Sequence, residues 1–314
     1  MIKVDHLTRI FGNFTAVDDI SFEIKKGEIV SFLGHNGAGK TTILKMLTGF
    51  LEPSGGSIFI DGLNMETRRS AIQKRIGYLP ENCPLYTEMT VIGYLEYTAS
   101  LHKIPESQRS AVIQKAITRT ELTQKATQQI SILSRGYRQR VGVAQAILHS
   151  PKIIILDEPT NGLDPGQIFQ MRSLVRELAL NATVIISTHI LQEVQAVCDR
   201  AIIIQNGKKY LDARLADLRR ADRLLVAIDA EPGQAKQVFD AVESVASFES
   251  LDAENNCFRY SLAVDGNDNA VNAAPAVAKA VIEKGFRLFS LSQETRDLET
   301  IFGEISAQEG RPAK

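Results

Sequence analysis

Hydrophobic and polar positions alternate in short segments over the first two thirds of the chain, and this pattern predicts strands separated by helices. Strands are predicted at residues 20–24, 28–33, 57–60, 77–79, 153–156 and 184–186. The last two runs are wholly apolar, which is typical of central parallel strands that are covered on both faces. A glycine-rich turn and an apolar helix near residues 43–47 follow the second strand. This succession of strands and helices indicates a layered α/β domain.

From residue 90 to about residue 126 the pattern changes to a helical one. Ile92, Leu95 and Ala99 fall at positions i, i+3 and i+7, so we expect them to share one face of a helix. We therefore expect a helical subdomain at about residues 85–150.

The last ~95 residues follow a different pattern, with alternating strands and an alanine-rich helix. The predicted order is a strand at 224–228, a helix at 234–242, strands at 248–251 and 258–264, a helix at 273–284 and a strand at 286–291. Gly285 is expected to end the second helix, and residues 254–256 are expected to form a hairpin turn. The order βαββαβ predicts a small ferredoxin-like α+β domain. We divide the chain into residues 1–220 and an accessory domain at residues 221–314.

Composition and charge limit the classes of function. The 314 residues are 44% hydrophobic and 23% charged, as in an ordinary soluble globular protein. The formal net charge is −1, and nucleic acid or anionic lipid would call for a clear basic excess in a partner protein. We therefore expect no nucleic acid among the partners of this chain.

Cysteines and apolar runs indicate the compartment. The three cysteines stand far apart and form no CxxC pair, which argues against a disulfide framework or a zinc site and for a reducing compartment. The first strand-like pattern is not preceded by a charged and apolar leader, so we expect no secretory signal. No apolar run approaches the ~20 residues of a membrane helix. If the protein works at a membrane, another chain has to span it.

Residues 34–41 fit the phosphate-loop pattern GxxxxGK[ST] and stand between an apolar strand and an apolar helix. Glycines let such a loop curl until its backbone N–H groups point at phosphate oxygens, and the helix that follows adds the positive end of its dipole. Lys40 is expected to reach the β- and γ-phosphates, and the Thr41 hydroxyl is expected to bind Mg²⁺. The residues predicted to bind ATP here are Gly34, His35, Asn36, Gly37, Ala38, Gly39, Lys40, Thr41 and Thr42.

Two carboxylates end the apolar run at residues 153–156. Asp157 and Glu158 are expected at the carboxyl end of a buried strand, close to the phosphate loop. Asp157 is predicted to hold Mg²⁺ through its water shell, and Glu158 is predicted to act as the general base on the attacking water. A solvated acidic turn after a strand is the simpler alternative for this pair.

Residues 133–137 read Leu-Ser-Arg-Gly-Tyr and precede the strand that carries the two carboxylates. Along residues 1–220 the chain thereby resembles the ATP-binding subunits of ABC transporters, whose signature motif is LSGGQ. The resemblance implies a P-loop ABC ATPase fold, with a mixed sheet core and a helical subdomain. It also implies that Ser134 and Gly136 contact the γ-phosphate held by the loop of a second copy. Two such half-sites close only as a head-to-tail dimer that sandwiches ATP.

Other positions match the family one by one. Phe11 stands where an aromatic ring stacks on adenine, and an ordinary core phenylalanine is the alternative. Asp164 matches the loop that crosses the dimer interface, and His189 matches the switch histidine that contacts the γ-phosphate. The resemblance thus implies Lys40, Glu158 and His189 as catalytic residues.

Two departures from the family pattern stand out. Glu81 occupies the position where the family usually has a glutamine that senses Mg²⁺, and a carboxylate there can still approach the metal while it adds negative charge beside the phosphates. The expected metal ligands are therefore Thr41, Glu81 and Asp157. In the signature motif, Arg135 and Tyr137 replace glycine and glutamine, whereas the serine and the glycine that contact phosphate are retained.

The combination of these motifs with a small C-terminal domain most resembles the ABC-2 exporter branch, which includes drug-resistance, gliding-motility and copper-maturation type ATPases. The resemblance implies an ATPase that energises a separate membrane permease. It also implies a cytoplasmic protein that is peripheral on the inner face of the cell membrane. The segment around residues 81–89 and the helical region after it are expected to receive the permease.

Two alternatives belong to other classes of function. A soluble ABC ATPase of the repair or translation kind usually carries two cassettes or a long coiled-coil insertion, and this chain shows one phosphate loop and neither feature. An ATP-binding regulatory scaffold is expected to lack the base or the switch histidine, and this chain has both Glu158 and His189.

Overall fold

The computed structural model describes residues 1–218, 223–254, 256–264, 270–294, 298 and 302–303. The chain divides into two compact units, Met1–Ala213 and Arg214–Lys314. Each unit has its own sheet and its own hydrophobic core. Among the residues that the structure describes, no helix has the length and the apolar character needed to cross a bilayer.

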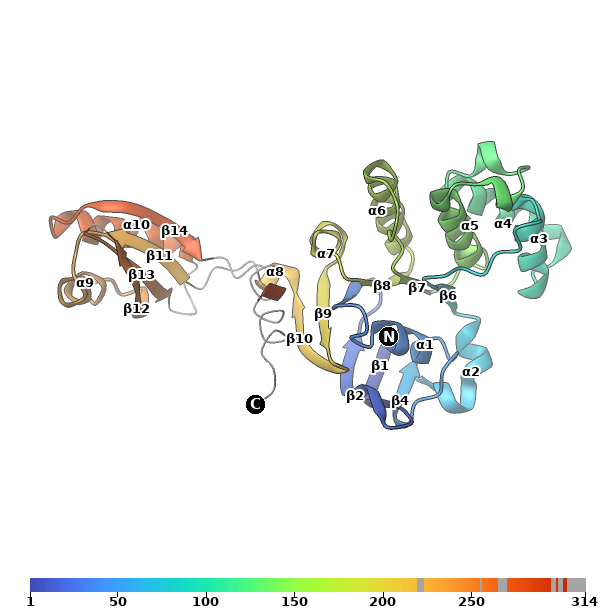
Figure 1. Ribbon diagram of the computed structural model, residues 1–314, viewed down its shortest axis with the longest axis horizontal. Coiled ribbons are helices and arrows are strands. Elements are labelled where there is room, and N and C mark those ends of the chain that lie inside the picture. The colour runs from blue at the N-terminus through green and yellow to red at the C-terminus, as the bar shows by residue number, and fades with distance from the viewer. Residues whose placement is uncertain (219–222, 255, 265–269, 295–297, 299–301, 304–314) are drawn as a thin grey trace. The chain divides into compact units, whose positions relative to one another are not determined.

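A six-stranded sheet forms the centre of the first unit (Figure 1). Its strands are β3 (Ile29–Leu33), β6 (Ile76–Leu79), β7 (Ile153–Asp157), β8 (Thr183–Thr188), β9 (Arg200–Gln205) and β10 (Lys208–Arg214). They lie in the order β10-β9-β3-β8-β7-β6, and the pairs from β9 to β6 are parallel. Every residue of β3, β7 and β8 is buried, as the apolar runs predict.

A four-stranded antiparallel sheet covers one face of this centre. It contains β1 (Ile2–Phe11), β2 (Phe14–Ile24), β4 (Gly55–Ile60) and β5 (Leu63–Asn64). Helix α1 (Lys40–Leu47) contributes to the same core, and α2 (Met65–Gln73) packs beside β4 and β5. Of the long β1–β2 hairpin, the sequence pattern predicts a strand at residues 20–24 and a strand-like start of the chain, without bounds for the rest. Bulges in the pairing of β1 with β2 interrupt the regular alternation that a pattern search needs.

Alternate residues of the central strands enter two different cores. Ile153 and Ile155 pack with α1 and the antiparallel sheet. Ile154 and Leu156 pack on the opposite face with residues from the helices of this unit. Because side chains alternate along a strand, covering both faces fixes where β7 ends and therefore where the next carboxylates stand.

Helices occupy residues 91–147 of the first unit. They are α3 (Val91–Leu101), α4 (Glu106–Arg119), the short 3₁₀ turns η1 (Thr123–Lys125) and η2 (Ile130–Ile132), and α5 (Arg135–Ile147). Leu95 and Ala99 face the core as expected. The expectation that Ile92 shares their face is wrong, because 43% of its surface is exposed. Val91 takes the buried position instead, so that the apolar face follows spacings of four residues. Helices α6 (Pro165–Ala179) and α7 (Leu191–Val197) complete the unit.

The second unit has the element order that the sequence predicts. It contains α8 (Leu215–Leu218), β11 (Arg223–Ile228), α9 (Pro232–Phe239), β12 (Val245–Glu254), β13 (Cys257–Val264), α10 (Ala270–Glu283) and β14 (Leu288–Glu294). From β11 onward the order is βαββαβ, and the antiparallel sheet has the order β12-β13-β11-β14 of a ferredoxin-like domain. Gly285 follows α10 with φ +81°, a conformation that ends helices. Of the predicted turn at residues 254–256, residue 255 lies outside the described residues.

Candidate functional site

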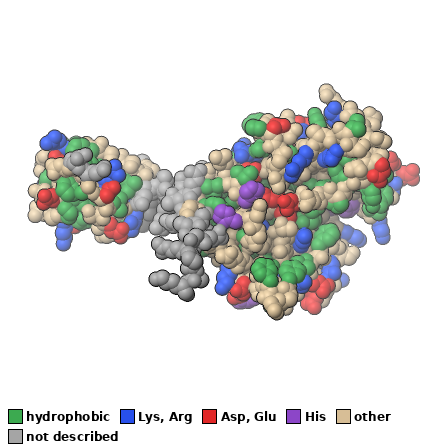
Figure 2. Space-filling model, viewed as in Figure 1, with side chains coloured by type: hydrophobic (Ala, Val, Ile, Leu, Met, Phe, Trp, Pro, Cys, Tyr) green, Lys and Arg blue, Asp and Glu red, His purple; other side chains and the backbone are tan. Residues whose placement is uncertain are grey.

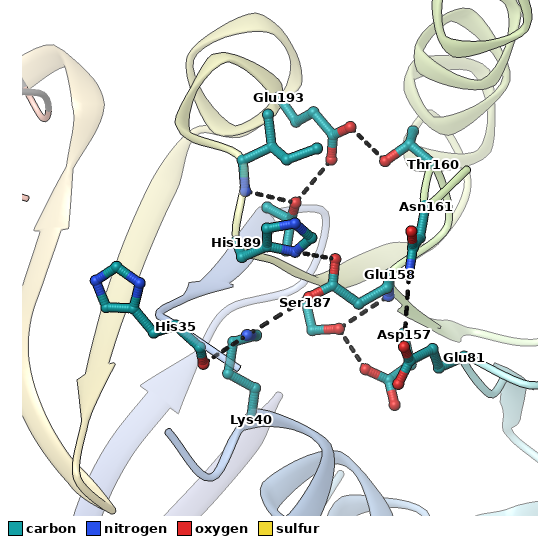
Figure 3. Close-up of polar contacts among 12 residues, drawn as sticks. His35, Lys40, Glu81, Asp157, Glu158, Thr160, Asn161, Ser187, His189 and Glu193 are labelled. Atoms are coloured by element: carbon teal, nitrogen blue, oxygen red, sulfur yellow. Dashed lines mark hydrogen bonds and ion pairs between the residues drawn. The ribbon is translucent and has the colours of Figure 1, made fainter. Parts of the chain in front are cut away.

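The carboxyl ends of three neighbouring strands bring the predicted site residues to one edge of the central sheet. β3 leads into the phosphate loop, β7 ends in Asp157, and β8 leads into His189. The register pairs Leu33 with Thr188 and Asp157 with Ser187, so these ends stand level with one another. In a parallel sheet this edge is where ligands bind, and Figure 3 shows side chains from the phosphate loop and the start of α1 meeting side chains from the ends of β7 and β8 there.

The phosphate loop is closely packed against its surroundings. A Cβ atom on Gly34 would lie 2.3 Å from the carbonyl oxygen of Ile204, and one on Gly39 would lie 2.6 Å from that of Ala16. Gly39 also has φ +108° and forms the N-cap of α1, a conformation that only glycine adopts without strain. A side chain at either of these two glycines would displace the backbone. Both glycines are therefore needed for the curved shape that receives phosphate.

Lys40 is buried at the start of α1, where only 5% of its surface is exposed. Its Nζ donates to the carbonyl oxygens of Gly34 at 2.7 Å and His35 at 3.1 Å. The same nitrogen lies 3.5 Å from Oε1 of Glu158 (Figure 3). The ammonium group therefore lies between the phosphate loop and the predicted base. It can exchange these contacts for a bound phosphate group.

Asp157 is completely buried and has one carboxylate oxygen without a protein partner. Its Oδ1 accepts hydrogen bonds from the hydroxyls of Ser187 and of Thr41, the latter at 3.2 Å. Its Oδ2 is buried and has no hydrogen-bond partner. Burial raises the pKa of Asp157, while the two hydroxyl bonds act against that shift. An unpaired carboxylate oxygen beside a threonine hydroxyl and a phosphate loop fits Mg²⁺, which prefers one or two carboxylates together with phosphate oxygens.

Glu158 and His189 form a hydrogen-bonded pair. Nδ1 of His189 lies 2.9 Å from Oε2 of Glu158. Burial raises the pKa of Glu158, and the charges of Lys40 and His189 partly offset this effect. The imidazole is 38% exposed whereas the carboxylate is 6% exposed, so the pair reaches from the interior to the surface. Figure 2 shows histidine and acidic side chains at the surface of this unit.

The backbone of Glu158 is also unusual. It has φ +48°, and its N–H lies 3.0 Å from Oγ and 3.2 Å from the carbonyl oxygen of Ser187. A left-handed conformation at a non-glycine residue costs energy, and it persists only where surrounding contacts determine it. The two bonds to Ser187 in β8 supply part of that support.

Glu81 lies at the exposed end of the segment that follows β6. Asn161 Nδ2 donates to its Oε1 at 3.5 Å, and Figure 3 shows Glu81 beside Asp157. A cleft of about 760 Å³ opens next to this point. It is lined by residues of α1, of the segment after β6 and of the ends of α3 and α5, among them Thr41, Tyr78, Glu81, Cys83, His102, His149 and Asp157.

Ser134 and Asp164 belong to a different group of contacts. Ser134 is the N-cap residue of α5, and its side chain makes no capping bond with that helix. Asp164 caps α6, where its Oδ1 accepts from the backbone N–H of Gln167 at 2.9 Å. A Cβ atom on Gly136 would lie 2.4 Å from Oε1 of Gln167. The first turn of α5, which carries the signature residue Gly136, thus touches the first turn of α6, which Asp164 caps.

Phe11 is not a core residue, because 45% of its surface is exposed at the end of β1. The guanidinium carbon of Arg9 lies 4.5 Å from the centroid of its ring. An exposed ring that is supported from one side by a cation can stack on a planar base.

The sequence pattern misses four polar residues that hold this site together. Ser187 bonds both Asp157 and the backbone of Glu158. Glu193 in α7 accepts hydrogen bonds from the hydroxyls of Thr160 and Thr188. In the sequence, the signal for these residues is limited to their nearness to Glu158 and His189.

Comparison with known proteins gives consistent matches. The family model described as ABC transporter matches residues 17–161. The uncharacterized ABC transporter ATP-binding protein YhcH of Bacillus subtilis (strain 168) is 31% identical over 98% of this chain and 96% of its own length. The bacitracin transport ATP-binding protein BcrA of Bacillus licheniformis is 37% identical over 70% of this chain and 77% of its own length.

A solved structure shows the same fold with nucleotide. It is the dimeric post-hydrolysis state of the ATP-binding cassette MJ0796, bound to ADP and Pi. It superimposes with a TM-score of 0.63 at 25% identity, and the match covers 68% of this chain and 99% of the cassette.

Proposed function

Because this chain belongs to the ABC transporter ATP-binding proteins, we propose that it drives an ABC-2 type exporter, in which a separate chain forms the membrane permease. It is an ATPase of that family and uses ATP with Mg²⁺. The observation that carries the proposal is the meeting of the phosphate loop, Asp157, Glu158 and His189 at one edge of the central sheet.

Thr41 and Asp157 are the proposed holders of Mg²⁺, and Glu81 lies beside them. The Thr41 hydroxyl now donates to Asp157, and Oδ2 of Asp157 is unpaired and buried. When bound, the metal neutralises charge that develops on the phosphate oxygens. Lys40 binds the β- and γ-phosphates in exchange for its present contacts with Gly34, His35 and Glu158.

Glu158 is the proposed general base. Its carboxylate accepts a proton from the attacking water, and a pKa raised by burial brings it closer to neutral pH, where a base is most effective. With Glu158 deprotonated, the Nδ1–H of His189 donates to Oε2 and keeps the carboxylate aimed at the position of the γ-phosphate.

Ser134, Gly136 and Asp164 are proposed to act on the nucleotide of a second copy. The uncommitted hydroxyl of Ser134 at the N-terminus of α5 offers a donor and a positive dipole end to a phosphate. The dimeric state of the MJ0796 cassette with ADP and Pi supports such an arrangement. Phe11 is proposed to stack on the adenine ring, which its exposure permits.

The permease is proposed to bind in the cleft beside Glu81. This cleft joins the metal side of the site, through Thr41 and Asp157, to the ends of α3 and α5. A segment inserted there would touch both the catalytic edge and the helical region, so that nucleotide state and permease conformation can influence one another.

The substitution Glu158→Gln tests the proposed chemistry. The amide preserves size and loses basicity, so we expect turnover to fall by at least about 100-fold while ATP binding is retained. Size-exclusion chromatography with ATP and Mg²⁺ is expected to show an accumulated dimer, because the nucleotide that joins the two copies is no longer consumed. Turnover at the wild-type rate would contradict the assignment of the base.

Lys40→Ala serves as the matched variant for the binding step. It removes the one buried ammonium group that faces the loop, and we expect ATP affinity to be lost, as measured by fluorescence of a labelled nucleotide. Unchanged affinity would contradict the assignment of the loop. Co-purification with a polytopic membrane protein tests the proposed partner.

A further inference from the structure

Glu193 is a carboxylate placed in an interior position. It lies in the first turn of α7, and only 6% of its surface is exposed. Isolated carboxylates are costly to bury, so such a residue needs hydrogen-bond donors around it. Within the described residues, no arginine, lysine or histidine forms an ion pair with Glu193.

Two threonine hydroxyls satisfy this carboxylate, one on each oxygen. Thr160 donates to Oε1, and Thr188 donates to Oε2 at 2.8 Å (Figure 3). The Thr188 hydroxyl in turn accepts the backbone N–H of Ile190 at 3.1 Å. Both threonines are themselves buried, so water does not compete for these bonds.

The two threonines flank the reacting residues. Thr160 follows Glu158 by two positions, and Thr188 directly precedes His189. One side chain therefore ties the loop that carries the base to the loop that carries its partner. These loops leave β7 and β8, and their tips meet through the bond of 2.9 Å between Glu158 and His189.

Resting on the function proposed above, we propose that Glu193 is a positioning residue, which fixes the distance between Glu158 and His189 through the hydroxyls of Thr160 and Thr188. The strained φ of +48° at Glu158 makes this tie necessary, because a loop free to relax would leave that conformation. Glu193 does not touch the reacting atoms, and it acts on the rate through geometry.

Glu193→Gln is the central variant. A glutamine side chain has one acceptor oxygen and an NH2 group, so one of the two threonine hydroxyls can no longer donate to it, and that bond is lost or reversed while volume is conserved. We expect kcat to fall by about 10- to 100-fold, the usual effect of losing a supporting hydrogen bond, with no change in the dissociation constant for ATP. Gln192→Ala, an exposed neighbour in the same helix, is the control and is expected to keep the wild-type kcat.

Substitutions at the two threonines separate positioning from simple loss of packing. Thr160→Val and Thr188→Val remove the donor and keep the shape, whereas Thr160→Ser and Thr188→Ser keep the donor and remove a methyl group. Positioning predicts that both serine variants retain a higher kcat than the corresponding valine variants. Glu193→Gln combined with either valine variant is expected to lose less than the product of the single effects, because all act through one network.

The outcomes are distinct. A wild-type kcat for Glu193→Gln overturns the inference. So does a parallel loss of kcat, ATP affinity and melting temperature in Glu193→Gln and in the threonine variants, if the serine variants retain no more than the valine variants. Glu158→Gln is measured alongside. If that variant turns over normally, the proposed base is wrong, whereas an inactive Glu158→Gln beside a fully active Glu193→Gln refutes the positioning role alone.

Discussion

At the residue scale, the two carboxyl groups at the end of β7 stand where water is scarce. Asp157 is fully buried and Glu158 is 5% exposed, and burial raises the pKa of both. A raised pKa means that the charged form is disfavoured in the folded protein relative to the unfolded chain. Keeping these carboxyl groups charged thus lowers the stability of the folded protein. Two measurable effects follow, one on the pH dependence of the rate and one on the stability of the nucleotide-free protein.

The first effect concerns the rate. As the proposed base, Glu158 has to be deprotonated to accept a proton, so kcat should fall as the pH drops through a pKa that lies above the ordinary value of 4.5. Phosphate groups of bound ATP add negative charge and move this pKa in the same direction. A profile of kcat between about pH 5 and pH 8 tests this, and an acidic limb at or below the ordinary glutamate value would contradict it.

The second effect concerns stability without nucleotide. A group with a raised folded pKa contributes stability below its unfolded pKa and loses that contribution as the pH rises through the folded pKa. Asp157→Asn removes the cost of burying the negative charge at neutral pH, so we expect the nucleotide-free protein to become more stable. Calorimetry should show a higher melting temperature together with loss of Mg²⁺-dependent turnover, and a lower melting temperature would contradict the expectation.

Motif residues of this site could be predicted from the sequence because their spacing is local. The loop at residues 34–41 and the pair Asp157–Glu158 each occupy one short segment. The role proposed for Glu193 could not be predicted from the sequence, because one donor, Thr160, lies in the loop after β7 and the other, Thr188, is the last residue of β8. A role of this kind can be recognised only when the register between β7 and β8 is known.

At the element scale, β6 and α5 approach each other closely at a glycine. A Cβ atom on Gly77 would lie 2.0 Å from the carbonyl oxygen of Ala146 and 2.9 Å from Cγ of Pro151. The obstacle is backbone, which cannot move aside as a side-chain end can. This contact fixes α5, and with it the signature loop, against the sheet.

Gly77→Ala is therefore expected to force the helix and the strand apart. We expect the free energy of unfolding to fall by about 1–3 kcal/mol, the cost of an overpacked core. The midpoint of unfolding in urea should be lower. Gly233→Ala is a suitable control, because nothing lies within 4 Å of the added atom and alanine favours the helix there. Gly233 belongs to the second unit, so the midpoint to compare is that of the first unit's transition, and an equal value in both variants would show that the contact is not tight.

Strand prediction succeeded where burial is continuous and failed where pairing is irregular. The apolar runs of β7 and β8 identified both strands to within a few residues. The β1–β2 hairpin is predicted only at the start of the chain and at residues 20–24, because bulges shift the faces of the residues between them. Ile92 was assigned to the wrong face of α3, since spacings of three and of four residues both fit a helix.

At the scale of the whole molecule, the chain consists of two units with separate cores. The sequence pattern changes near residue 220, and the structure separates compact units between Ala213 and Arg214. The first unit carries every proposed site residue, whereas the second has a ferredoxin-like sheet and its own apolar cluster. Binding energy from a nucleotide is therefore delivered to the first unit only, with its two clusters on the two faces of the central sheet.

Calorimetry with nucleotide tests this division. For Glu158→Gln, ATP with Mg²⁺ at about 100 times its dissociation constant should stabilise the first unit by about 2.7 kcal/mol. At about 2–4 °C per kcal/mol, its transition should move up by about 5–11 °C, while the transition of the second unit stays in place. A single transition that moves as a whole would show that the two units unfold together.

The resting contact between Lys40 and Glu158 has a consequence for timing. While the ammonium group lies 3.5 Å from the carboxylate, it lowers the proton affinity of the base. Arrival of a triphosphate draws this cation away, so the glutamate gains proton affinity at the moment when a target for the activated water is present. In the nucleotide-free site the cation thus lowers the proton affinity of the proposed base, and binding of the triphosphate removes this effect.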